Sequence, residues 1–169
     1  MPDVIGPGLR VLFCGINPGV YSAAVGHQFA RPGNRFWKAL WGSGLTDRLV
    51  SPFEDRTLLA LGLGVTNLCA RTTARAEHLD EGELRRGART LAAKARRYDP
   101  EWVAFLGVGA YRTAFHRPRA GLGPQAERLG PARLWVLPNP SGLNAHYSLA
   151  DLTEQFGALR QAAAPRFSG

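Results

Sequence analysis

The sequence has little cysteine, and its few histidines are scattered. Cys14 and Cys69 are too few for the disulfide framework of a secreted protein or for a four-cysteine iron–sulfur cluster. The histidines lack the spacing of metal ligands; they stand at His27, His78, His116 and His146. We therefore expect neither a metal nor another cofactor.

Long apolar runs are also missing. No stretch approaches the roughly 20 residues that a membrane-spanning helix needs. The first residues, Met1 to Arg10, lack the charged segment followed by an apolar segment that marks a secretory signal. These absences predict a cytoplasmic protein that does not enter a membrane.

Lysine is scarce, but positive charge is not. Lys38 and Lys94 are the only lysines among 21 basic residues, against 13 acidic ones, which gives a net charge of +8 and a pI near 10.5. Such an excess favours polyanionic partners, either nucleic acid or the surface of an anionic membrane. Charge alone does not choose between them, and a compositional bias toward arginine would explain part of the excess.

Short apolar runs predict a sheet whose strands alternate with helices. At 169 residues and 45% hydrophobic, the chain has the size of one domain, residues 1–169. Four runs have the length and composition of buried strands: Leu9–Cys14, Gly64–Leu68, Trp102–Leu106 and Leu134–Leu137. This alternation predicts a parallel sheet covered on both faces, with ligands bound outside the carboxyl ends of the strands.

Two helices have clear start signals. One begins at Asp80, where Glu83 completes a capping box and apolar residues then recur at helical spacing. The other begins at Ser148, with Asp151 in the corresponding position. The segment from Arg117 to Pro131, rich in Gly, Pro and Arg, is predicted to be one long exposed loop.

The loops after the first and last predicted strands each contain an Asn-Pro pair beside small residues. The segments Asn17–Gly19 and Asn139–Gly142 would let backbone amides approach a ligand closely, although such residues also form ordinary turns. Gly15 and Gly19 do not make a dinucleotide-binding fingerprint, because the third glycine and the following acidic residue are missing. The Gly-Lys-Ser/Thr ending of a P-loop is missing too.

Four motifs together resemble the mismatch-specific uracil-DNA and thymine-DNA glycosylases. They are GINPG, GHQFARPGNRFWK, GVTNLCARTT and NPSGL, in the order and spacing of that family, over roughly Leu9 to Leu159. The resemblance implies an α/β fold with three layers, α/β/α, and a short, mainly parallel central sheet. It also implies an active site between the first and last of these loops.

The resemblance implies a chemistry that runs without a strong base. In that family the asparagine of GINPG, here Asn17, positions the attacking water. Asn139 stands where faster relatives have a histidine. Because acid–base groups usually contribute about 10²–10⁴-fold, we expect a slow enzyme that favours good leaving groups such as uracil. Backbone N–H groups near Ile16 and Phe29 would stabilise the departing base.

Other matched positions would bind the flipped base. Phe29 corresponds to the aromatic residue that stacks on it, whereas Phe36 and Trp37 are assigned to the core. Ser22 matches the position along the pyrimidine 5-edge, and Asn67 matches a polar residue at the pocket rim.

The last motif would supply the wedge that fills the hole left in the DNA stack. The resemblance assigns this role to Gly142, Leu143 and Asn144, with Leu143 intercalating and nearby backbone groups pairing with the orphaned guanine. Close relatives often have Ser-Arg after the leucine, so His146 is a candidate substitute for a phosphate contact.

Two further positions leave questions open. Tyr21 replaces a smaller residue and would either narrow the pocket or widen its contacts. The segment from Arg71 to Glu83 contains Asp80 and Glu81, and a carboxylate that reached the site would restore a general base. The capping position of Asp80 explains that residue without catalysis.

These features predict a monomeric, monofunctional glycosylase that acts in base excision repair. It would remove uracil, or thymine and modified pyrimidines, from G·U and related mismatches in double-stranded DNA. No lysine lies in the motifs apart from Lys38 at the end of the second, so no Schiff-base lyase step is expected. Two alternatives stay open: a non-catalytic module that binds mismatches or abasic sites, and a nucleotide-binding α/β domain unrelated to DNA.

Overall fold

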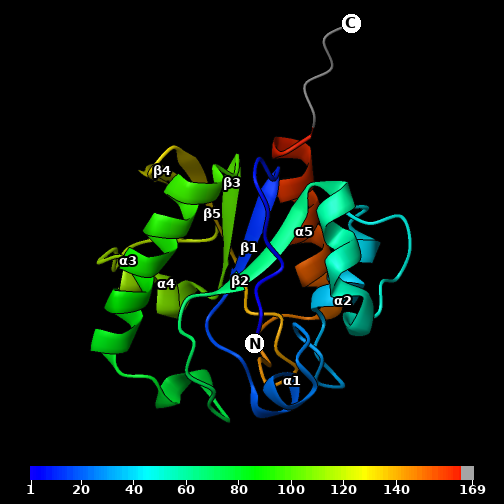
Figure 1. Ribbon diagram of the computed structural model, residues 1–169, viewed down its shortest axis with the longest axis horizontal. Coiled ribbons are helices and arrows are strands. Elements are labelled where there is room, and N and C mark those ends of the chain that lie inside the picture. Colours follow the sequence, from blue (N-terminus) through cyan, green and yellow to red (C-terminus); the bar gives the residue numbers. More distant parts are fainter. Residues whose placement is uncertain (165–169) are drawn as a thin grey trace, which may run out of the picture.

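A five-stranded sheet lies between two layers of helices in the computed structural model, which describes residues 1–164 (Figure 1). The strands follow the order β2-β1-β3-β5-β4. Their bounds are β1 Val11–Gly15, β2 Leu63–Asn67, β3 Trp102–Leu106, β4 Gly123–Leu129 and β5 Ala132–Leu137. All neighbouring pairs are parallel except β4 with β5. The predicted α/β fold with a mainly parallel sheet is confirmed.

The central strands are buried on both faces because alternate residues point into different helical layers. On one face, Phe13 and Ala104 pack in a cluster with α2 (Phe36–Gly42) and α5 (Leu149–Ala162). On the other, Cys14 and Phe105 pack with α3 (Glu81–Tyr98) and α4 (Val108–Ala114). Figure 1 shows these two helix pairs on opposite sides of the sheet. Phe36 and Trp37 are core residues, as predicted.

Both predicted helix caps are present. The Asp80 carboxylate accepts a hydrogen bond from the Glu83 amide at 2.8 Å, and the Ser148 hydroxyl accepts one from the Asp151 amide at 3.1 Å. Each third helical residue bonds back to its cap, so both are complete capping boxes. Hydrogen bonds from Ser148 hold the pKa of the Asp151 carboxyl below its ordinary value.

The prediction of one long exposed loop from Arg117 to Pro131 was wrong. This segment contains β4, which pairs antiparallel with β5 at the edge of the sheet. Its two ends are buried and the residues between them alternate between exposed and partly exposed, so only one face meets the protein. An edge strand of this kind needs few apolar residues, and its register shift near Pro124 further blurs the strand pattern.

The remaining elements lie between the strands and the main helices. They are α1 (Val20–Val25) and two 3-10 helices, η1 (Pro52–Leu61) and η2 (Ala76–His78). The N-terminal segment covers the β2 edge, where Val4 pairs antiparallel with Val65. No helix within residues 1–164 combines the length and apolar character that crossing a membrane requires.

Candidate active site

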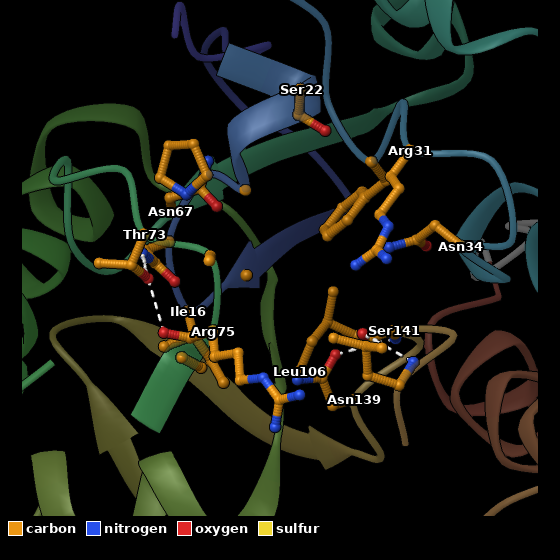
Figure 2. Close-up of a pocket in the computed structure, with 18 of the residues that line it drawn as sticks. Ile16, Ser22, Arg31, Asn34, Asn67, Thr73, Arg75, Leu106, Asn139 and Ser141 are labelled. Carbon is orange, nitrogen blue, oxygen red and sulfur yellow. Dashed lines mark hydrogen bonds between the residues drawn. The ribbon is translucent and has the colours of Figure 1, made fainter. Parts of the chain in front are cut away.

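A pocket of about 300 Å³ opens at the carboxyl ends of the parallel strands (Figure 2). Gly15, Asn67 and Leu106 end β1, β2 and β3 and line it, and Asn139 lines it from just after β5. The strand ends therefore gather segments that are far apart in the sequence. This is the location expected for ligand binding in a parallel α/β sheet.

The Asn17 side chain is held in one orientation. Its Nδ2 donates to the Arg71 carbonyl at 2.8 Å and to Thr73 Oγ1 at 2.7 Å. Thr73 Oγ1 in turn donates to the Arg75 carbonyl at 2.7 Å, a bond drawn in Figure 2. Because a carbonyl can only accept, both Asn17 N–H groups are used. No donor within residues 1–164 reaches Asn17 Oδ1, so this oxygen keeps its capacity to accept, and Asn17 is one of the residues that line the pocket.

The segment that carries Asn17's acceptors is anchored by an ion pair. The Arg71 guanidinium contacts both carboxylate oxygens of Glu83, at 2.7 and 2.8 Å. This contact holds the pKa of the Glu83 carboxyl below its ordinary value. The Asn17 amide is thus connected to the first turn of α3 through the Arg71 backbone.

Phe29 forms an aromatic wall of the pocket and has a strained backbone. Its φ is 51°, in the left-handed region that non-glycine residues rarely adopt. Its ring packs on Phe36, with ring centroids 4.3 Å apart. A Cβ atom at Gly15 would lie 3.2 Å from Phe29 Cζ and 2.9 Å from Asn67 Oδ1. Glycine at position 15 is therefore what lets Phe29 and Asn67 approach the end of β1.

Hydrogen bonds on both sides fix the Phe29 backbone. The Gln28 amide donates to Oδ2 of the buried Asp55 at 3.2 Å, and His27 Nδ1 lies 3.3 Å from Asp55 Oδ1. The Ala30 amide donates to Ser22 Oγ at 2.9 Å. The Phe29 amide between them is bonded to no acceptor within residues 1–164.

The rim residue Asn67 is fixed by a buried glutamine. Asn67 Nδ2 donates to Gln28 Oε1 at 3.0 Å, and Gln28 Nε2 donates to the Pro2 carbonyl at 3.0 Å. Gln28 is only 2% exposed, so its amide cannot turn without losing these bonds. The Asn67 amide is consequently held with its oxygen toward Gly15.

Asn139 is oriented by its own loop. Its Oδ1 accepts a hydrogen bond from the Ser141 amide at 3.0 Å, which makes an Asx-type turn. A backbone N–H can only donate, so Oδ1 is assigned and Nδ2 faces no acceptor within residues 1–164. Asn139 therefore presents donors to the pocket, whereas Asn17 presents an acceptor.

Leu143 stands on a short, internally bonded turn at the pocket rim. Its side chain is exposed, and its amide donates to Ser141 Oγ at 3.2 Å. The Asn144 amide donates to the Ser141 carbonyl, and Asn144 Nδ2 donates to the Asn139 carbonyl, both at 3.0 Å. The turn is therefore formed before any ligand binds.

Two arginines reach the pocket from opposite sides. Figure 2 shows Arg31 on the side of Asn34 and Arg75 on the side of Thr73. Arg75 lies 3.5 Å from Glu77 in an exposed pair, and Arg31 has no ion-pair partner within residues 1–164. Two arginines against one glutamate give the charged lining residues a net positive charge.

The structure brings most of the predicted site residues together. Eight of the sequence candidates contribute to the pocket lining: Ile16, Asn17, Ser22, Phe29, Asn67, Asn139, Leu143 and Asn144. Gly142 lies on the exposed turn between the lining residues Ser141 and Leu143.

Three other candidates lie outside the pocket lining. The Asp80 carboxylate is engaged as a helix cap, and Tyr21 is exposed on α1 and does not narrow the pocket. His146 is exposed on the loop before α5. The carboxylate that does line the pocket is that of Glu77, on η2.

Sequence reasoning missed several residues that shape the site. Gln28, Arg31 and Thr73 fall inside the quoted motifs, but the motifs did not mark their roles. Gln28 and Thr73 contact Asn67 and Asn17, which are distant from them in the chain. Arg75 and Glu77 lie after the third motif and carried no signal. Their place in the pocket follows from the path of the chain between β2 and α3.

The two cysteines do not supply a nucleophile. Burial raises the pKa of the Cys14 and Cys69 thiols, which keeps both protonated near neutral pH. The polar and aromatic groups among the lining residues are instead amides, hydroxyls, an aromatic ring, two guanidinium groups and the carboxylate of Glu77.

Comparisons with known proteins identify the fold and the family of the chain. Among solved structures, the chain is similar to the solution NMR structure of a candidate uracil DNA glycosylase from Methanosarcina acetivorans, with a TM-score of 0.62, 19% identity and 95% of each chain covered. At that identity the likeness concerns the fold. The profile of the Uracil DNA glycosylase superfamily matches residues 2–163, nearly the whole sequence. The chain therefore belongs to the uracil DNA glycosylase superfamily.

Proposed function

We propose that this protein is a monofunctional DNA glycosylase that removes uracil from mismatches with guanine. The observation that carries the proposal is the Asn17 amide, whose two N–H groups are bound to Arg71 and Thr73 and whose oxygen is left as an acceptor at the pocket. An acceptor fixed in this way orients a water molecule without removing its proton. Water then attacks C1′ of the deoxyribose, and an abasic site remains.

The base leaves as an anion, and fixed donors stabilise it. The uracil ring stacks on Phe29, where aromatic stacking is worth about 1–3 kcal/mol per base. The Phe29 N–H and Asn139 Nδ2 then donate to the carbonyl oxygens of the leaving base. Donors that are already oriented stabilise developing charge without reorganising, which is their main contribution to rate.

The weak proton chemistry of the site makes leaving-group quality decisive. The lining carboxylate, Glu77, is largely exposed and pairs with the exposed Arg75, so no buried donor orients it toward the substrate. Asp80 acts as a helix cap rather than as a base. Uracil and pyrimidines with electron-withdrawing 5-substituents should therefore leave readily, whereas normal cytosine should not.

Two features favour a preference for mismatches: the exposed Leu143, and the lower cost of unpairing a mismatched base. Leu143 is preformed on an exposed turn and would fill the space left by the flipped nucleotide. A mismatched base costs less to unpair than a matched one, so G·U substrates open more easily. Arg31 and Arg75 would bind phosphates on either side of the flipped nucleotide.

The direct test is abasic-site formation by the purified protein on G·U, A·U and single-stranded uracil oligonucleotides. We expect the highest rate with G·U and an Asn17→Ala loss on the order of 10²–10³-fold in kcat with little change in Kd. Gln161→Ala, an exposed amide on α5, is the matched control and should keep full activity. No abasic product from any substrate would refute the enzyme proposal.

The exposed state of Glu77 favours one alternative, a module that binds mismatches or abasic sites without turnover. Such a module would bind a G·U duplex tightly, lose that binding in Leu143→Ala, and form no abasic product at any enzyme excess. Stoichiometric product formation with a slow second turnover would instead identify an enzyme limited by product release.

A further inference from the structure

Arg35 contacts the turn that carries Leu143, although it lies more than 100 residues away in the chain. We call residues 139–147 the wedge loop. Arg35 Nη2 donates to the Ser141 carbonyl at 2.9 Å and to the Asn144 carbonyl at 3.0 Å, and Nη1 donates to the Tyr147 carbonyl. One guanidinium thus binds three backbone carbonyls spread along the loop.

Two backbone contacts extend the same interface. The Arg35 amide donates to the Pro140 carbonyl at 3.0 Å. A Cβ atom at Gly142 would lie 2.7 Å from the Gly33 carbonyl oxygen, so the loop and the segment 33–35 touch backbone to backbone. Arg35 Nε is buried and has no acceptor within residues 1–164, so the side chain's polar contacts are those with the wedge loop.

The same short segment also supports the base pocket. Asn34 lines the pocket, and Phe36 is the ring on which Phe29 packs. Arg35 stands between them in the sequence and is partly buried. Phe36, which supports the stacking ring, and Arg35, which supports the wedge loop, are therefore adjacent residues at the start of α2.

We propose that Arg35 is a positioning residue that holds the wedge loop in register with the base pocket, so that insertion of Leu143 and capture of the flipped base occur together. This inference rests on the proposed glycosylase function. A loop that had to become ordered on binding would lose affinity, and a preformed loop avoids that loss. Arginine suits the position because its planar fork reaches several acceptors, whereas lysine offers a single charged centre.

The test is a double-mutant cycle between Arg35→Gln and Leu143→Ala. Binding is measured on a G·U duplex that carries a non-hydrolysable 2′-fluorinated uridine, and excision is measured on the natural duplex. We expect Arg35→Gln to weaken binding and excision by roughly tenfold in the wild-type background and by less than about twofold in the Leu143→Ala background. Equal losses in the two backgrounds would overturn the proposal.

Two further variants separate positioning from folding. Arg35→Lys keeps the charge and the side-chain stem, and Gly142→Ala pushes the loop from Gly33 without changing any charge; both should reproduce the Arg35→Gln defect. Arg89→Gln, an exposed arginine on α3, is the control for lost charge and should bind normally. Lys and Ala variants that melt like the wild type and bind with wild-type affinity would refute the inference.

The binding measurement keeps this inference distinct from the proposed function. If the wild type forms no abasic product, the glycosylase proposal fails, and the cycle on the uncleavable duplex still reports the coupling between Arg35 and Leu143. If the wild type excises uracil but Arg35→Gln reduces excision equally from duplex and single-stranded DNA, the glycosylase stands and the positioning role falls. A single strand has no stack to fill, so wedge variants should spare it.

Discussion

Two Asn-Pro turns contribute to the pocket lining and present opposite chemistry. Asn17 follows β1 and is oriented by acceptors 54 and 56 residues away, which leave its amide oxygen toward the pocket. Asn139 follows β5 and is oriented by the Ser141 amide two residues on, which leaves its amide nitrogen. The same side chain thus offers an acceptor for water in one turn and donors for the leaving base in the other. Its surroundings, not its identity, set its role.

After the loss proposed above for Asn17→Ala, the next largest effect in this comparison should come from removing the donor, Asn139. Asn139→Ala should lower excision of uracil from G·U by roughly 10²-fold, because one fixed donor to the leaving base is lost. The loss should be smaller for 5-fluorouracil, a better leaving group that needs less stabilisation. Single-turnover rates on the two substrates measure this. An equal loss for both bases would contradict the assignment of Asn139 as the donor.

The orientation of the Asn17 amide can be changed without substituting Asn17 itself. Thr73→Val keeps the shape of the side chain but removes the oxygen that accepts from Asn17 and donates to the Arg75 carbonyl. The amide then has one partner fewer and excision should fall by about tenfold with unchanged Kd. Thr73→Ser keeps the hydroxyl and should restore most of the rate. A serine variant as slow as the valine variant would show that the methyl group matters instead.

Removing the two arginines at the pocket mouth should weaken DNA binding without changing the relative contributions of the Asn17 and Asn139 turns. Arg31→Gln combined with Arg75→Gln should weaken binding to any duplex and reduce the slope of log Kd against log salt by about 2, one for each phosphate contact. The ratio of rates on uracil and 5-fluorouracil should not change. Binding titrations at several salt concentrations provide the measurement, and an unchanged slope would place the phosphates elsewhere.

The smallest expected effect concerns the ion pair between Arg71 and Glu83, which anchors the segment that holds the Asn17 side chain. Because Arg71 lowers the folded-state pKa of Glu83, the pair stabilises the protein fully above the ordinary carboxyl pKa. This stabilisation is lost as the pH falls through the lowered value. Glu83→Gln should therefore reduce the melting temperature at pH 7 by about a few degrees, since the Arg71–Glu83 pair is accessible to solvent. The difference from wild type should shrink in acid, and a constant difference would point to the lost cap contact instead.

Local patterns in the sequence were sufficient to predict the parts of the fold that local physics controls. The capping boxes at Asp80 and Ser148 and the buried runs of the parallel strands depend on near neighbours and on burial. The strand β4 escaped prediction because half its residues face solvent and its partner strand supplies the pairing. The resemblance identified Asn17 as a site residue, but its orientation depends on Arg71 and Thr73, which only the folded chain brings near it.

The same limit applies to Arg35. Its place in GNRFWK drew attention to the motif but not to the arginine, since its three acceptors are backbone carbonyls, which have no sequence signature. Asp55 is similar: a buried carboxylate that accepts from the Gln28 amide cannot be told from a surface acid by its neighbours in the chain.

Gly15 has a hydrogen atom where other residues have a side chain, and two features of the pocket depend on that small size. The Phe29 ring and the Asn67 amide both rest where a methyl group on this residue would stand. Even the smallest side chain there would push the stacking surface and the polar rim at once, so these two features cannot be retuned separately from this position. Changes in the range of bases accepted must come from the outer wall, where the lining residue Arg31 is exposed and has room to vary.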